Sequence, residues 1–166
     1  MSFVIIRHRK ENLKKCSLRG LEGREGFLFL RYPECLEGVF PSVEGCILLD
    51  VDGSELVPTD QEPLILLDAT WKYATQMRNN IPQLAECQRR RLPDTWRTAY
   101  PRYQTGCSDP ERGLASIEAL YVASLITGRS TDGLLDGYYW KDQFLEKNNP
   151  FLDDLNGNSV VHRSSP

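Results

Sequence analysis

Histidine is almost absent from this sequence, and its cysteines are not arranged in pairs. His8 and His162 are the only two histidines and lie near opposite ends of the 166-residue chain. A catalytic triad or a zinc site needs imidazole groups close to its other members, so we expect neither, and no metal. The five cysteines form no CxxC pair, which indicates a reduced, cytoplasmic chain.

Long apolar runs are also missing. No run approaches the roughly 20 residues that cross a bilayer, so we expect no membrane partner. The opening MSFVIIRHRK places a short apolar patch before its basic residues, which is the reverse of the order in a signal peptide. The chain is 40% hydrophobic and 26% charged, as is usual for globular proteins. Its length fits one compact domain, or two small ones with a shared core.

The net charge of −3 argues against a nucleic-acid partner, but the distribution of charge does not. Residues 1–24 hold seven Lys or Arg against two acids, and residues 78–102 hold six Arg against two acids. If these two basic blocks lie close together, they form a positive patch for a polyanion. The alternative is that both blocks are ordinary solvated faces.

Short, continuous apolar runs dominate the first half of the chain. They lie at residues 3–6, 27–30, 46–49 and 64–67, and a less apolar run at 86–92 predicts an edge strand. Continuous runs are typical of strands that are covered on both faces. Helical stretches are expected between some of them, near Cys35 and after Asp68. The pattern therefore predicts an α/β fold with a mostly parallel sheet over residues 1–91.

The second half of the chain has a helical pattern. Residues 113–128 predict an amphipathic helix that ends at Gly128, and residues 133–148 predict one or two more helices. We therefore expect an all-α unit over residues 92–155. The polar residues 156–166 predict a flexible tail.

The stretch LLDATWKYA places a carboxylate directly behind a buried strand. Ligands of open parallel sheets bind beyond the carboxyl ends of the strands, so Asp68 is a candidate ligand-binding residue. A helix that starts at Ala69 would bring Asp68, Trp71 and Ala74 to the same end of the sheet. The alternative is structural: Asp68 caps this helix and Trp71 packs in the core.

Five groups of motifs occur in an order that resembles the small-subunit rRNA aminocarboxypropyltransferases, a family related to the tRNA-modifying DTW-domain proteins. They span roughly residues 10 to 150. They are KKCS at 14–17, DATW at 68–71, RRLP at 90–93 with the turn AYPRYQTG at 99–106, LASIEA at 114–119, and YYWK at 138–141 with FLEKN at 144–148. In the LASIEA motif, Ala115 replaces a hydroxyl residue and removes one half of a capping box with Glu118.

The resemblance implies a SPOUT-like fold, with an α/β amino-terminal half, an all-α carboxyl-terminal half and a deep trefoil knot. The implied cofactor is S-adenosylmethionine, bound between the halves. The implied reaction moves its 3-amino-3-carboxypropyl group to N3 of a uridine or pseudouridine in small-subunit rRNA, a step of ribosome biogenesis. We expect the enzyme to be a cytoplasmic monomer.

The resemblance also implies roles for individual residues. Trp71 and Ala74 line the niche for the cofactor's methyl group, and Ser116 offers helix amides to its carboxylate. Asp68 is the candidate catalytic residue, which attracts the sulfonium or the amine or accepts the proton from N3. The full set of expected cofactor-binding residues is Ser17, Leu49, Leu67, Asp68, Trp71, Ala74, Leu92, Leu114 and Ser116.

The basic blocks gain a role from the same resemblance, as groups that neutralise RNA phosphates. The expected RNA-binding residues are Lys14, Lys15, Arg19, Arg89, Arg90, Arg91, Arg97 and Arg102. Three other functions stay open at this point. They are a tRNA-directed aminocarboxypropyltransferase, a SPOUT-type RNA methyltransferase and a non-catalytic RNA-binding assembly factor.

Overall fold

All five predicted strands form, and they build one parallel sheet in the computed structural model, which describes residues 1–101 and 113–153. The strand order is β2-β1-β4-β3-β5, so β5 lies at an edge as expected. This arrangement confirms the α/β fold. The strands are β1 (Phe3–His8), β2 (Phe27–Tyr32), β3 (Ile47–Glu55), β4 (Leu64–Asp68) and β5 (Gln88–Arg91).

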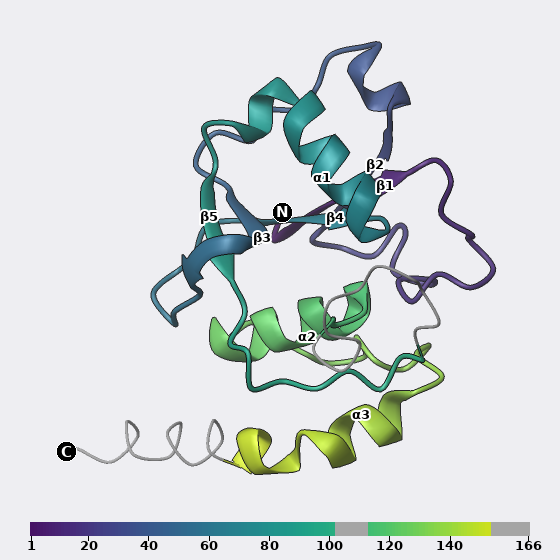
Figure 1. The fold of residues 1–166 in the computed structure, drawn as a ribbon, viewed down its shortest axis with the longest axis vertical. Coiled ribbons are helices and arrows are strands. Elements are labelled where there is room, and N and C mark those ends of the chain that lie inside the picture. The colour runs from purple at the N-terminus through teal and green to yellow at the C-terminus, as the bar shows by residue number, and fades with distance from the viewer. Residues whose placement is uncertain (102–112, 154–166) are drawn as a thin grey trace.

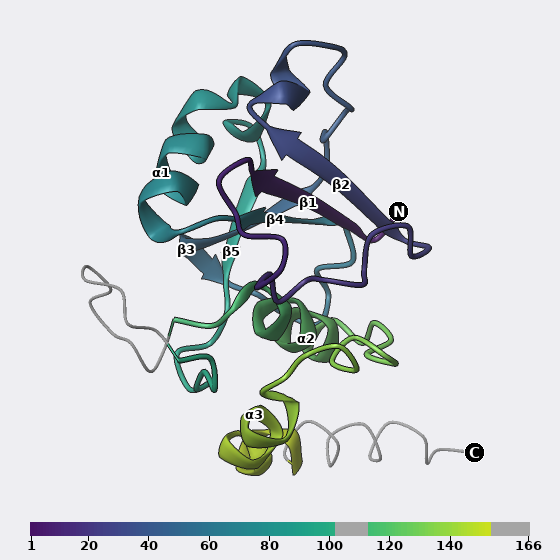
Figure 2. The ribbon, with the colours of Figure 1, turned by 90° about the vertical axis from the view of Figure 1, so that its right-hand side faces the viewer.

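Helices cover both faces of this sheet (Figures 1 and 2). Side chains of a strand alternate between the two faces, so Val4 and Ile6 of β1 belong to one core and Phe3 and Ile5 to the other. The first core lies under α1 (Trp71–Asn80), and the second lies against α2 (Ser116–Ile126) and α3 (Lys141–Lys147). Burial on both sides explains why the runs that predict these strands are continuously apolar.

The predicted helix boundaries need four corrections. The helix after β4 starts at Trp71 rather than Ala69, because Thr70 has an extended backbone with ψ 156°. The helix predicted over 113–128 covers Ser116–Ile126 and is followed, as predicted, by Gly128 with φ +66°. Of the stretch 133–148 only α3 is helical, since Gly133 has φ +69° and turns precede the helix. The segment near Cys35 forms only a short 3-10 turn, η1 (Glu34–Leu36), and a second such turn is η2 (Pro82–Leu84).

Strand β3 extends beyond its apolar part through an irregular stretch. Its pairing with β5 shifts register between Leu49 and Ser54, so residues 50–53 bulge out of the ladder. Gly53 lies in this bulge, and a Cβ atom there would lie 2.5 Å from the backbone carbon of Arg89. The bulge therefore depends on a residue without a side chain.

Substitution of Gly53 tests this close approach. We expect Gly53→Ala to lower the free energy of unfolding by about 1–3 kcal/mol, because the added methyl forces two strands apart. The matched control is Gly38→Ala, whose Cβ would meet nothing within 4 Å. Urea denaturation of both variants measures the difference, and equal stability of the two would contradict this account of the bulge.

Candidate functional site

The centre of the sheet contains a point where the chain leaves two neighbouring strands in opposite directions. After β1 it runs to the edge strand β2, and after β4 it forms α1 and continues to the other edge strand, β5. Arg7 and Asp68 are register partners near these two strand ends. Ligands of open parallel sheets bind at such a switch point, so a site is expected beside these residues.

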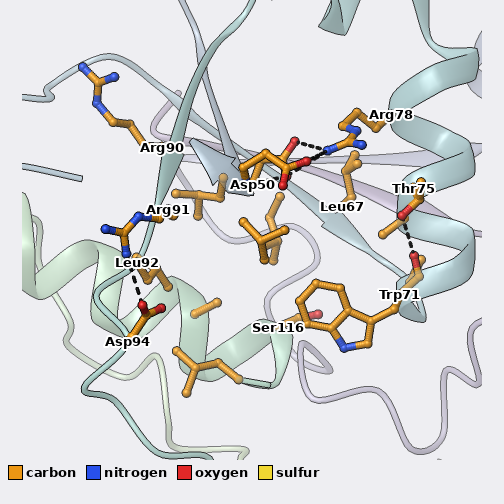
Figure 3. Close-up of a pocket in the computed structure, with 18 of the residues that line it drawn as sticks. Asp50, Leu67, Trp71, Thr75, Arg78, Arg90, Arg91, Leu92, Asp94 and Ser116 are labelled. Atoms are coloured by element: carbon orange, nitrogen blue, oxygen red, sulfur yellow. Dashed lines mark hydrogen bonds and ion pairs between the residues drawn. The ribbon is translucent and has the colours of Figure 1, made fainter. Parts of the chain in front are cut away.

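A cavity of about 310 Å³ opens next to this point (Figure 3). Its volume lies at the lower end of the range for small-molecule sites, and aliphatic side chains with one indole form much of its wall. Such a wall fits a flat, nucleoside-like ligand. We call it the large pocket; its lining includes Leu49, Leu66, Leu67, Ala69, Trp71, Ala74, Leu92, Leu114, Ser116 and Ala119.

Helix α1 turns one face toward the large pocket. Trp71, Ala74, Thr75 and Arg78 all line it, and their spacing places them on one side of a helix. Trp71 is 41% exposed, so the alternative that it packs in the core is wrong. Its indole is therefore available to a ligand, and the small side chain of Ala74 leaves space beside it.

An ion-pair cluster bounds the large pocket on the side away from Ser116 (Figure 3). The Arg78 guanidinium lies 2.9 Å from a carboxylate oxygen of Asp50 and 2.7 Å from one of Asp52. These hydrogen bonds raise the pKa of Arg78. The cluster joins α1 to the bulge of β3 and so fixes the width of the pocket.

A second, smaller pocket of about 110 Å³ adjoins the first, and the two share Ala69 and Ser116 as lining residues. It is lined by groups of both charges, with the carboxylates of Glu11 and Asp68 and the ammonium of Lys15. We call it the small pocket. Among the described residues, its lining is Glu11, Lys15, Cys16, Ser17, Asp68, Ala69, Thr70, Tyr100, Ala115 and Ser116.

The amino-terminal end of α2 also faces the small pocket through Ser116, its first residue. Helix amino termini favour anions, and carboxylates favour ammonium groups. A pocket that combines Asp68 with Lys15 and this helix end therefore suits a small group with one negative and one positive charge.

The carboxylate of Asp68 accepts hydrogen bonds from three different parts of the chain. Arg7 donates through Nε (2.8 Å), Ser116 through Oγ (2.7 Å) and Cys16 through Sγ (3.5 Å). The Asp68 side chain is only 7% exposed, and Asp68 lines the small pocket rather than the large one. The structure thus holds one carboxylate in a fixed orientation at the junction of β1, α2 and the segment 9–26.

These contacts settle the structural alternative for Asp68. The residue that caps α1 is Thr70, and no side chain donates or accepts a capping hydrogen bond there. The interpretation of Asp68 as a helix cap is therefore wrong.

Arg7 lies behind Asp68 and is itself buried. Its Nη1 is 2.6 Å from Glu22, and its Nη2 donates to Cys16 Sγ at 3.2 Å. Burial disfavours the charged guanidinium, but the hydrogen bonds with Asp68 and Glu22 outweigh burial and raise the pKa of Arg7. One guanidinium thus faces two carboxylates, so the cluster of Arg7, Asp68 and Glu22 has an excess of negative charge.

Cys16 is not a nucleophile in this arrangement. Burial, followed by the negative charge of Asp68, raises the pKa of its thiol to about 11. The thiol therefore stays protonated at neutral pH and serves as a donor to Asp68.

The start of α2 is organised by Glu118, which is fully buried. Its carboxylate accepts from the backbone amide of Ala115 at 2.8 Å, which is the half of the capping box that survives without a hydroxyl at this position. It also accepts from Thr98 Oγ1 (2.6 Å) and Tyr138 Oη (2.9 Å). Glu118 thereby sets the position of Ser116 relative to the segment before the helix.

The structure brings together all nine predicted cofactor residues, in two adjoining groups. Ser116 belongs to both groups, and its neighbour Ile117 donates its amide to Ser17 Oγ at 3.3 Å. The large pocket holds Leu49, Leu67, Trp71, Ala74, Leu92 and Leu114, and the small pocket holds Ser17 and Asp68.

The predicted RNA-binding residues divide differently. Lys14, Lys15 and Arg19 are exposed, whereas Arg90 lines the large pocket and is held by Asp60 at 2.8 Å. Arg91 pairs with Glu55 and Asp94, Arg89 approaches Asp50 at 4.0 Å, and Arg97 donates to backbone carbonyls. Arg102 lies outside the described residues.

Sequence reasoning missed Arg7, Asp50 and Arg78. A signal existed for Arg7 alone, since a charge that follows FVII within a buried strand needs a partner. Asp50 and Arg78 belong to segments whose sequence is typical of an ordinary solvent-exposed surface. Within the described part of the chain, no group of His, Cys, Asp and Glu could hold a metal ion, and no helix is long and apolar enough to cross a membrane.

The sequence matches no protein-family model and no curated protein. Among solved structures, the fold is similar to that of the SAM-dependent rRNA:acp-transferase Tsr3 from Vulcanisaeta distributa. The TM-score is 0.68 at 24% sequence identity, and the similarity covers 95% of this chain and 84% of that one. This similarity establishes a shared fold.

Proposed function

We propose that this protein is an S-adenosylmethionine-dependent aminocarboxypropyltransferase that acts on N3 of a uridine or pseudouridine in small-subunit rRNA. The observation that carries the proposal is the pair of adjoining pockets at the switch point of the sheet. One pocket suits a nucleoside and the other suits a group with an amine and a carboxylate, and S-adenosylmethionine joins these two parts through a sulfonium. The described function of the structural neighbour supports the same reaction.

The large pocket would take the adenosine. Leu49, Leu67, Leu92 and Leu114 line this pocket and would supply apolar contact. By the family resemblance, the backbones of Leu67 and Leu92 would bind ribose and adenine. Trp71 and Ala74 would enclose the methyl group on the α1 side. An enclosed methyl is shielded from attack, and selection among the three carbons on sulfur then depends on which one is presented to the nucleophile.

The small pocket would take the aminocarboxypropyl arm. Ser17, Lys15 and the start of α2 would bind its carboxylate, and Asp68 would face its amine or the adjacent sulfonium. The bound cofactor would supply an electrophilic carbon: N3 would form a bond to it while its bond to sulfur breaks, methylthioadenosine would leave, and the N3 proton would pass to solvent water. Asp68 already accepts three hydrogen bonds, which favours an electrostatic role over that of proton acceptor.

The RNA would approach from the side of residues 9–26. Lys14, Lys15 and Arg19 are exposed there, and Lys15 lines the small pocket itself. We rank these three above Arg89, Arg90, Arg91 and Arg97, since an arginine paired with a carboxylate or a carbonyl has less capacity to neutralise phosphate.

The finer expectations from the family resemblance belong to the same proposal. They comprise a deep trefoil knot, a division into residues 1–91 and 92–155, a flexible tail at 156–166, and a cytoplasmic, metal-free monomer. An experimental structure of the whole chain, with its connectivity traced from end to end, would test the knot. The tail lies outside the described residues. Phe151 and Leu152, which come before it, pack on the core.

The nucleoside product is the decisive test of the function. We expect S-adenosylmethionine to bind with micromolar-range affinity by calorimetry, and incubation with rRNA to release methylthioadenosine. Mass spectrometry of rRNA nucleosides from cells with and without the protein should show one modified uridine or pseudouridine that depends on it.

Each alternative gives a different outcome in the same experiment. Release of S-adenosylhomocysteine would identify a methyltransferase, and modified tRNA would identify a tRNA-directed enzyme. RNA binding without any cofactor heat would identify an assembly factor and would contradict the proposal.

A further inference from the structure

The two parts of the chain that carry Asp68 and Ser17 into the small pocket have a common contact in Arg7. The guanidinium bonds to Asp68 on β4, to Cys16 next to Ser17, and to Glu22 at the far end of the same segment. Arg7 does not line either pocket and is only 9% exposed. Arg7 can therefore influence a bound ligand only through Asp68, Cys16 and Glu22.

The geometry uses the whole guanidinium fork. Nε faces Asp68, Nη1 faces Glu22 and Nη2 faces Cys16, and the group also lies over the ring of Phe29 at 5.0 Å. A planar group with several fixed donors can bind three partners at once, whereas a lysine ammonium on the same strand is a single point charge. The substitution Arg7→Lys would keep the charge and lose this arrangement.

The segment 9–26 contains no strand or helix of its own, so its position rests on side-chain contacts, which include those of Arg7 and the packing of the buried Leu18 and Leu21 in the core. Glu22 also accepts from the backbone amide of Gly20 at 3.2 Å, and its pKa is lowered because the Arg7 hydrogen bond outweighs its partial burial. The contacts of Arg7 at both Cys16 and Glu22 thus fix the segment that carries Lys15 and Ser17.

We propose that Arg7 is a positioning residue, which holds Asp68 and the segment around Ser17 in the arrangement that receives the aminocarboxypropyl arm. This inference rests on the proposed function, because it assigns the small pocket to that arm. It assigns no contact between Arg7 and the cofactor. The partners of the Arg7 guanidinium, Asp68, Cys16 and Glu22, do not line the large pocket, which would bind the nucleoside.

The test compares two ligands that differ by the arm and by the positive charge on sulfur that comes with it. S-adenosylmethionine and methylthioadenosine are titrated calorimetrically into full-length wild type, Arg7→Lys and the control Arg129→Lys. Arg129 also forms several bonds through its guanidinium, to the carbonyls of Asp60 and Glu62, but lines neither pocket. We expect Arg7→Lys to lower affinity for S-adenosylmethionine roughly tenfold, since a bond between charged groups contributes on that order. Affinity for methylthioadenosine should stay unchanged, and the control should change neither.

A measurement without ligand accompanies this comparison. Hydrogen exchange of amides within residues 14–22 should become faster in Arg7→Lys and stay unchanged in Arg129→Lys. If Arg7→Lys fails to fold, Glu22→Gln replaces it, because the Glu22 side chain is 46% exposed and tolerates the change. It should move both readouts in the same direction by a smaller amount.

The outcomes separate the two claims. An equal loss of affinity for both ligands, or an unchanged ratio, would overturn the positioning role while leaving the proposed function in place. A wild type that binds neither ligand would overturn the proposed function and, with it, the role of Arg7 in that reaction.

Discussion

Replacement of Trp71 by alanine should weaken S-adenosylmethionine binding by about 10- to 100-fold. The indole is 41% exposed at the wall of the large pocket, and covering a large apolar side chain with a ligand contributes about 1.5–3 kcal/mol. Because the side chain is not part of the core, the variant should fold normally. Methylthioadenosine should lose affinity to a similar degree, since its nucleoside and methyl group are proposed to lie in this pocket.

Two further variants make this result specific. Trp71→Phe keeps an aromatic face and should retain most of the affinity. Tyr139→Ala removes an aromatic ring that is 82% exposed and lines neither pocket, so it should bind as wild type does. Wild-type affinity in a well-folded Trp71→Ala would show that the large pocket is not the nucleoside site.

Replacement of Asp68 by asparagine should weaken the binding of the aminocarboxypropyl arm without weakening the binding of the nucleoside. Loss of one charge-assisted interaction costs about 1–3 kcal/mol, which corresponds to about 5- to 150-fold in affinity for S-adenosylmethionine. Methylthioadenosine, which lacks the amine and the sulfonium, should bind as before. At saturating cofactor, modification of rRNA should continue if Asp68 acts mainly as an electrostatic partner.

Asp60→Asn is the matched control, because Asp60 is also a buried carboxylate held by an arginine, Arg90. It should lower stability without a change in the ratio of the two affinities. If Asp68→Asn instead kept cofactor affinity and lost turnover, Asp68 would be the proton acceptor. If both were unchanged, its carboxylate would only support the structure.

The strands were predictable because strands that are buried on both faces have continuous apolar runs in the sequence. The outer part of β3 was not predictable from the sequence. Its residues after Leu49 lie at a bulge near the sheet edge and show no apolar pattern typical of a strand. The helix ends were misjudged at Thr70 and around Gly133 for a similar reason. Backbone angles at one or two residues decide them, and periodicity averages over longer stretches.

The site was predictable only where a residue type was unusual for its position. Asp68 is a charged residue at the end of an apolar strand, and Trp71 is a large aromatic residue three positions later. The residues that surround them in the fold are far away in sequence. Cys16 and Ser116 reach Asp68 across 52 and 48 positions. Spacing along the chain carries no information about such contacts, so the division into two pockets and the ion pairs around Arg78 required the fold.

The bond between Ser116 and Asp68 also bears on the order in which the site is assembled during synthesis. Strand β4 leaves the ribosome well before α2, and until α2 arrives Asp68 lacks this donor and the wall shared by the two pockets. Ala119 of this helix and Leu114, two residues before its start, close the large pocket at the same stage. A nascent chain that ends before α2 therefore has a sheet but no complete binding site, and ligand binding can report that the carboxyl-terminal half has docked.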